Sequence, residues 1–314
     1  MTAPSSGAAR RAASRASAAG NRTSLIWETR VDRTHLHAIL PGWRSQSSEC
    51  CGVWSPDGSY YFFLSYVDQV RGANIWALRQ SKRLFSNSSS EPMQLTAGPV
   101  QFGALAPSPD GKKLFAEGFQ ARGELVRHDL SSRQFVPFLS GSSAGDLAFS
   151  TDGKWIAYVS YPERTLWRSR ADGSDRRQLT FQPIVAAMPR WSSDASQLAF
   201  LDMESGSGWK ILLLSAEVGV PQEMRTEDFS QADAAWSPDG QHLIALSNDS
   251  RRILLFDFNT GNWSDWISVR GTLGYPNWSS DGKYLYFATS ETGRPAYYRA
   301  SLGQSRPELL LDLP

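Results

Sequence analysis

The sequence predicts an all-β protein, a β-propeller made of four-stranded antiparallel blades. The first observation is a five-residue motif, Trp-Ser-Pro-Asp-Gly at 236–240, that recurs with small changes along the chain. Its six aspartates stand at positions 57, 110, 152, 194, 239 and 281, which gives steps of 53, 42, 42, 45 and 42 residues. These steps are typical of propeller blades and exclude a heptad or a helical repeat of about 34 residues.

The second observation is the plan inside one repeat, which is clearest from Gly145 to Phe181. Four short alternating segments predict strands, from innermost to outermost, at 146–149, 155–159, 166–169 and 177–180. The Ser/Pro-x-Asp-Gly stretch closes the first turn, because the aspartate caps its own turn and the glycine accepts a positive φ. The repeated motif is therefore predicted to be a turn and not an active-site loop.

Two repeats depart from this plan. Ala195 replaces the usual glycine of the fourth copy, so we expect a strained or different turn and a locally irregular repeat there. The first repeat is longer than the others, and its excess residues lie between Arg79 and Glu91. This excess predicts a solvated loop between the third and fourth strands.

The segments 25–32 and 36–42 match the third and fourth strands of a further unit that lacks its first two strands. The β-propeller domain is therefore expected to cover 25–314, with six complete blades and an N-terminal half blade. A seven-blade ring either closes with that half blade or stays incomplete, as in a fragment of a longer chain. Residues 1–24 are rich in Ala, Ser and Arg and predict a disordered tail.

Composition limits the classes of partner. The 314 residues include 32 Lys+Arg and 31 Asp+Glu, a formal net charge of +1, so no direct nucleic-acid binding is expected. No apolar run is long enough to span a membrane, and the N-terminus lacks the apolar segment of a secretory signal. The chain as written is expected to be cytoplasmic, with a periplasmic location left open if the N-terminus is truncated.

Cofactors and metals are not expected. Cys50 and Cys51 are neighbours whose Cβ atoms would point apart in an extended strand, so the sequence predicts no disulfide between them. His35 and His37 could share a metal with Asp32, but solvent-facing histidines are the simpler interpretation. The 141–145 segment fits Gly-x-Ser-x-Gly, yet it lies between two predicted strands where a nucleophile elbow needs a helix. Catalysis is therefore not expected.

The motif copies, with following strands such as Trp155–Val159 and Leu-Thr endings such as Gln178–Thr180, resemble the TolB-like (WD40-like) β-propeller repeat. More narrowly, Glu49–Gly52 and Gly274–Trp278 resemble the propeller half of acidobacterial-type proteins that carry an N-terminal winged helix. That resemblance implies a sensor or interaction module. No DNA-reading helical segment stands before Leu25, so the DNA-binding part of such a regulator is not expected here.

Propellers usually bind ligands where the innermost strands surround the central channel. One residue before the motif, Arg190 and Asn277 are polar where other copies have apolar residues. Three residues before the first motif position stand Asp146, Asp233 and Tyr275. These five residues are the candidate binding site, and hydrogen bonding between blades is the alternative role for each.

A second set of candidates is basic. Each connection between second and third strands carries a cation, and together these predict a rim that could hold an anionic ligand or an acidic partner: Arg71, Arg122, Arg164, Lys210, Arg251 and Arg294. Nearby acids could neutralise them: Asp68, Glu124, Glu163, Glu204, Asp249 and Glu291.

These observations favour a non-catalytic propeller that binds a protein partner or a small ligand at the channel rim, as the sensor or interaction module of a bacterial regulator. Two alternatives stay open. One is the propeller portion of a prolyl oligopeptidase-type hydrolase, and the other is a TolB-like periplasmic interaction protein.

Overall fold

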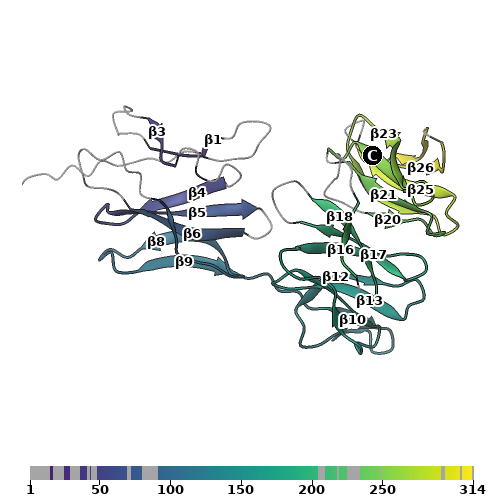
Figure 1. The fold of residues 1–314 in the computed structure, drawn as a ribbon, viewed down its shortest axis with the longest axis horizontal. Coiled ribbons are helices and arrows are strands. Elements are labelled where there is room, and N and C mark those ends of the chain that lie inside the picture. Colours follow the sequence, from purple (N-terminus) through teal and green to yellow (C-terminus); the bar gives the residue numbers. More distant parts are fainter. Residues whose placement is uncertain are drawn as a thin grey trace, which may run out of the picture. The chain divides into compact units, whose positions relative to one another are not determined.

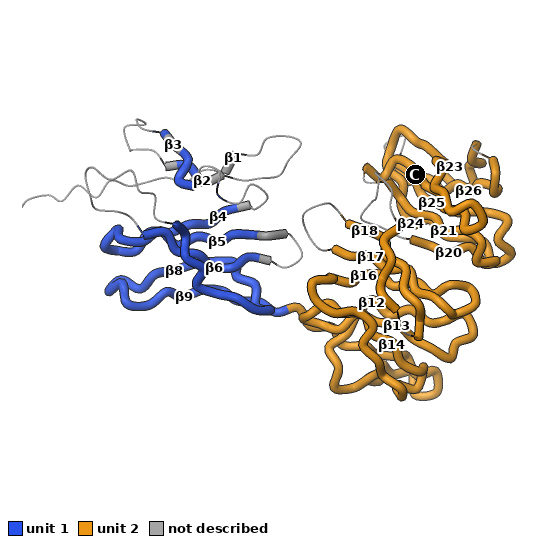
Figure 2. The backbone as a smooth tube through the Cα atoms, viewed as in Figure 1, with its two compact units in different colours: residues 1–120 blue, residues 121–314 orange. Residues whose placement is uncertain are grey.

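The computed structural model describes residues 15–16, 25–28, 36–40, 43, 48–68, 72–79, 91–203, 209–217, 219–224, 234–247, 249–290, 294–304 and 306–312. Within these residues every regular element is a strand (Figure 1). The chain divides into two compact units, residues 1–120 and 121–314 (Figure 2). The predicted all-β propeller architecture is confirmed.

The described part of the first unit contains one complete blade. Its four-stranded sheet runs in the order β4 (Ser48–Trp54), β5 (Tyr60–Asp68), β6 (Gly72–Arg79) and β7 (Met93–Gln94). The predicted insertion falls between β6 and β7, where residues 80–90 lie outside the described residues.

The predicted half blade pairs as expected. Strand β2 (Leu25–Glu28) pairs antiparallel with β3 (His37–Ala38), and β1 (Arg15–Ala16) adds to β2. Of the tail 1–24, only Arg15 and Ala16 are described.

The second unit contains four complete blades in chain order. Each is a four-stranded antiparallel sheet with its strands in sequence order. The strands are β12 (Ala144–Phe149), β13 (Trp155–Ser160), β14 (Thr165–Arg170), β15 (Arg177–Gln178), β16 (Ala186–Trp191), β17 (Gln197–Asp202), β18 (Lys210–Ser215), β19 (Gln222–Glu223), β20 (Ala235–Trp236), β21 (His242–Leu246), β22 (Arg252–Asp257), β23 (Asn262–Ser268), β24 (Leu273–Trp278), β25 (Tyr284–Thr289), β26 (Ala296–Ser301) and β27 (Glu308–Asp312).

The second repeat differs from the prediction of one four-stranded blade. Its strands form two separate pairs, β8 (Gln101–Pro107) with β9 (Leu114–Phe119), and β10 (Val126–Asp129) with β11 (Gln134–Pro137). Between the pairs, Gly123 bonds instead to the start of β12. Its N–H donates to Ser143 Oγ at 3.1 Å and its carbonyl accepts from Ala144 N at 3.0 Å.

Second strands of the second unit are deeply buried, most of all in β13 and β17. Ile156–Val159 of β13 and Leu198–Leu201 of β17 are buried at every position. Such uninterrupted apolar runs are expected of strands covered on both faces. Val159 and Phe200, for example, belong to one core cluster between adjacent blades.

The motif tryptophans link neighbouring blades of this unit. Trp191 Nε1 donates to the carbonyl of Ala148 at 3.1 Å, and Trp278 Nε1 donates to that of Ala235 at 3.2 Å. Trp236 does the same to Arg190 at 3.2 Å. Each bond joins an innermost strand to the innermost strand of the preceding blade. The indole therefore donates a hydrogen bond between blades in addition to its apolar packing.

All six motif copies form the predicted turn. In the fifth, Ser237 Oγ donates to Asp239 Oδ1, and the N–H of Gly240 donates to the carbonyl of Ser237 at 2.9 Å. Ala195 makes the corresponding bond to Ser192 at 3.0 Å with φ of 57°, in the left-handed region. The fourth turn is therefore strained, as one alternative predicted, but the expected irregularity is wrong because its hydrogen bonds are those of the other copies.

The prediction for the cysteines is wrong, since Cys50 and Cys51 form a disulfide. The reason is a β-bulge in β4, where the ladder to β5 shifts between Cys50 and Val53. Cys51 has a φ of 59°. The left-handed backbone at Cys51 departs from the extended geometry on which the prediction rested.

Candidate functional site

The same bulge recurs on three of the innermost strands of the second unit. The ladders to the second strands shift between Gly145 and Ala148, between Ala187 and Arg190, and between Gly274 and Asn277. The first residue inside each bulge has a left-handed φ: 50° at Asp146, 50° at Met188 and 56° at Tyr275. A bulge leaves its extra residue out of the ladder and redirects the strand, so it can turn a side chain toward solvent.

These bulge residues are exposed although they lie on the innermost strands. Tyr275 is 81% exposed and Met188 37% exposed, and the Asp146 side chain is also exposed. The following residues, Pro189 and Pro276, are buried. The innermost strands contact one another in the order β12, β16, β20 and β24. We call Asp146, Met188 and Tyr275 the bulge face.

Asp146 has both a structural and an electrostatic role. Its Oδ2 accepts the N–H of Met188 at 3.2 Å, which ties one bulge to the next. Burial raises the pKa of Tyr161, the nearby Arg164 opposes this shift, and the carboxylate of Asp146 adds to it. Asp146 therefore accepts a hydrogen bond from the next blade, which is the alternative role considered for it, and its side chain is still exposed.

Arg164 was predicted as a rim cation, and the structure places it against Tyr161. Its guanidinium carbon lies 5.4 Å from the centre of the Tyr161 ring, and Nη2 lies 3.5 Å from Met203 Sδ. Its Nε is buried and has no hydrogen-bond partner among the described residues. Asp146, Tyr161 and Arg164 thus bring a carboxylate, a phenol and a cation together beside the bulge face.

The remaining predicted site residues lie on other strands or outside the described residues. Arg190 is half-buried on β16, and its Nη1 donates to the carbonyl of Pro189 at 3.2 Å. Asn277 is exposed on β24, two residues after Tyr275. Strand β20 lies between β16 and β24. Asp233 lies outside the described residues.

The basic rim is partly neutralised. Arg122 pairs with Glu124 at 3.3 Å, as predicted, whereas Lys210 pairs at 3.4 Å with Glu223 of β19. Arg294 is exposed. The side chains of Arg71, Asp68, Glu204 and Glu291 lie outside the described residues.

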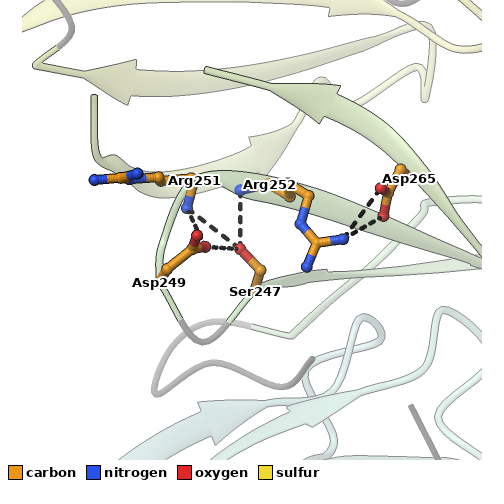
Figure 3. Close-up of polar contacts among 5 residues, drawn as sticks. All are labelled: Ser247, Asp249, Arg251, Arg252 and Asp265. Carbon is orange, nitrogen blue, oxygen red and sulfur yellow. Dashed lines mark hydrogen bonds and ion pairs between the residues drawn. The ribbon is translucent and has the colours of Figure 1, made fainter. Parts of the chain in front are cut away.

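Asp249 does not neutralise Arg251 through a side-chain bond. Its Oδ1 accepts the backbone N–H of Arg251 at 3.0 Å and the hydroxyl of Ser247 at 2.6 Å, and Figure 3 shows the Arg251 side chain extending away from it. Arg252 pairs instead with Asp265 at 3.1 Å. Ser247 and Asp249 repeat the Ser-x-Asp spacing of the motif turns, a signal that sequence reasoning overlooked between second and third strands.

The serines of the Gly-x-Ser-x-Gly segment bond to neighbouring segments. Ser142 Oγ accepts from Arg176 and Ser143 Oγ accepts from Gly123, and the next element is the strand β12. The described residues include no group of three or more His, Cys, Asp or Glu side chains that could hold a metal. Asp32 and His35 are not among them. No helix in the described part is long and apolar enough to cross a membrane.

Comparison with known proteins identifies the repeat. Residues 156–310 match the TolB β-propeller domain, PD40. This match covers β14 to β26 and most of the flanking strands of the second unit. The TolB-like resemblance of the motif copies is thereby supported.

Individual relatives share shorter segments with this chain. The Tol-Pal system protein TolB of Anaeromyxobacter dehalogenans is 36% identical over 86 residues, 26% of this chain and 20% of that protein. Dipeptidyl-peptidase 5 of Porphyromonas gingivalis is 35% identical over 78 residues, 22% of this chain and 11% of that protein. The matches therefore span at most a fifth of these two relatives.

Among solved structures, a puromycin-hydrolyzing peptidase of Mycobacterium tuberculosis aligns with a TM-score of 0.47 and 17% identity, covering 96% of this chain and 53% of that chain.

Proposed function

We propose that this protein is a non-catalytic TolB-like propeller that binds a protein partner through the bulge face. The observation that carries the proposal is Tyr275, a large aromatic side chain 81% exposed on an innermost strand. Exposed tyrosines of this kind are typical anchors of protein interfaces. The carboxylate of Asp146 on the same face would favour a partner with basic residues.

The proposal extends to the cellular role. We infer a sensor or interaction module of a bacterial regulator, with DNA binding supplied by another polypeptide or segment. Support comes from the segments Glu49–Gly52 and Gly274–Trp278, which resemble the propeller half of winged-helix regulators. The second of these segments contains Tyr275 itself.

A second candidate is the propeller portion of a prolyl oligopeptidase-type hydrolase. It is favoured by the segment shared with the dipeptidyl-peptidase of Porphyromonas gingivalis. In that case the hydrolytic residues would belong to a different domain. Ser142 and Ser143, the serines of the Gly-x-Ser-x-Gly segment, are engaged in hydrogen bonds between turns.

The test is affinity capture of binding proteins with the full chain as bait, followed by mass spectrometry. We expect Tyr275→Ala to reduce capture of a specific protein at least tenfold. Tyr297→Ala is the matched control, because Tyr297 is 43% exposed on the third strand β26. An unchanged set of captured proteins would contradict the site assignment. An α/β-hydrolase among them would favour the second candidate.

A further inference from the structure

The vicinal disulfide lies at the position of β4 that corresponds to the bulge residues of the second unit. Cys51 stands three residues before Trp54, as Tyr275 stands three before Trp278. It shares their left-handed backbone, with φ of 59°, and it is exposed. The exposure of this cysteine is therefore imposed by the repeat architecture.

The two sulfur-bearing residues have different surroundings. Cys51 is exposed, whereas Cys50 is half-buried and packs against a core cluster of Leu64, Ala73 and Ile75. An attacking thiolate needs access to one sulfur and a leaving thiolate on the other. This asymmetry makes Cys51 the accessible side of the bond and Cys50 the leaving side.

We propose that Cys50–Cys51 is a reversible thiol–disulfide exchange site whose cosubstrate is a small dithiol. A thiolate of the dithiol attacks Cys51 Sγ, the intramolecular S–S bond breaks, and the electron pair leaves with Cys50 Sγ, which takes a proton. The second thiol of the cosubstrate then attacks the mixed disulfide and releases Cys51 as a thiol. The protein gains two electrons and two protons, and the dithiol becomes a cyclic disulfide.

The reduced state is a pair of thiols on consecutive residues, which is the arrangement that a trivalent arsenical can bridge. Phenylarsine oxide reacts with two thiols to form two As–S bonds and release one water molecule. A single thiol can form only one As–S bond, and a monothiol wash displaces the arsenical from it. Phenylarsine oxide therefore distinguishes the reduced pair from one isolated accessible cysteine.

Native alkylation followed by intact-mass measurement tests the exchange. The folded full chain should take no iodoacetamide before reduction and two carbamidomethyl groups after brief treatment with dithiothreitol. Subsequent oxidation with oxidised glutathione should restore the unreactive state. Alkylation of both cysteines without reductant would overturn the disulfide. Reaction only after unfolding in guanidinium chloride would overturn its accessibility.

The arsenical arm uses Cys50→Ser as the matched variant. The reduced wild-type chain should retain one phenylarsine group after washing with a monothiol, whereas Cys50→Ser should retain none. Cys50→Ser should also take one carbamidomethyl group without any reductant, which verifies that this variant still exposes Cys51. Equal retention by the two proteins, or none by the wild type, would contradict the proposal.

Discussion

At the residue scale, one serine hydroxyl organises each motif turn. Ser150 Oγ donates to Asp152 Oδ1 at 2.6 Å and accepts the N–H of Trp155 at 3.0 Å. The aspartate also accepts the N–H of Lys154 at 3.1 Å. Three backbone or side-chain groups are thus satisfied inside a five-residue connection. This explains why Ser and Asp stand in all six copies, whereas the proline between them stands in only three.

These hydrogen bonds predict acid sensitivity. The bond from Ser150, followed by that from the Lys154 N–H, lowers the pKa of Asp152 from 3.8 to about 2. The other five motif aspartates shift in the same direction. Because the folded state favours the carboxylates, their contribution is complete above about pH 4 and is lost as the pH falls toward 2.

Urea unfolding at several pH values measures this effect. We expect the wild-type free energy of unfolding to fall between about pH 4 and pH 2, and Ser150→Ala to make that fall shallower. The control is Ser268→Ala, at an exposed position of β23. The same pH dependence in Ser150→Ala and wild type would show that the turn does not hold the carboxylate.

The indole bonds predict a cost for a conservative change. Trp278→Phe keeps an apolar ring but leaves the Ala235 carbonyl without its donor. We expect a loss of about 1 kcal/mol in urea unfolding, since the change leaves a part-buried carbonyl without its donor. Tyr297→Phe should change stability by less than about 0.5 kcal/mol. Equal stabilities for the two variants would contradict an inter-blade role for the indole.

At the element scale, the bulge of the innermost strand decides which side chains reach the surface. Turns, strand order and buried second strands were predictable, because they depend on Asp, Gly and uninterrupted apolar runs such as Trp155–Val159. The bulges were not predictable, because the residues at this position have unrelated side chains: Cys51, Asp146, Met188 and Tyr275. The left-handed backbone results from the register with the second strand and does not require a particular residue type, so the sequence does not reveal the bulge.

The same reasoning explains the outcome at the candidate site. Asp146 and Tyr275 were identified because they vary between aligned copies, and both are exposed. Met188 was passed over as an ordinary apolar residue. The disulfide was missed because an extended strand was assumed where Cys51 has a φ of 59°.

Glycine substitution tests the backbone assignment. Met188→Gly should leave stability unchanged or raise it by up to about 1 kcal/mol, because glycine adopts a left-handed φ without the penalty of a Cβ. Ala187→Gly, one residue earlier and buried in the same strand, should lower stability by about 1 kcal/mol. Thermal unfolding of both variants gives the comparison. A larger loss in Met188→Gly than in Ala187→Gly would contradict the bulge.

At the scale of the whole molecule, repeats joined in series leave function to the positions where the copies differ. The four complete blades of the second unit are tied by three indole bonds and by shared core clusters. The formal net charge of +1 gives no general attraction to a polyanion. Under the proposed function, recognition would come from local groups, and the bulge face offers an exposed aromatic ring and a carboxylate.

The most direct measurement is site-specific photocrosslinking in producing cells, with a benzoylphenylalanine at position 275 or, as control, at position 297. The account predicts a discrete crosslinked protein for Tyr275, lost when Asp146→Ala is added, and none for Tyr297. Equal crosslinking from both positions, or crosslinking from Tyr297 alone, would contradict a partner site on the bulge face.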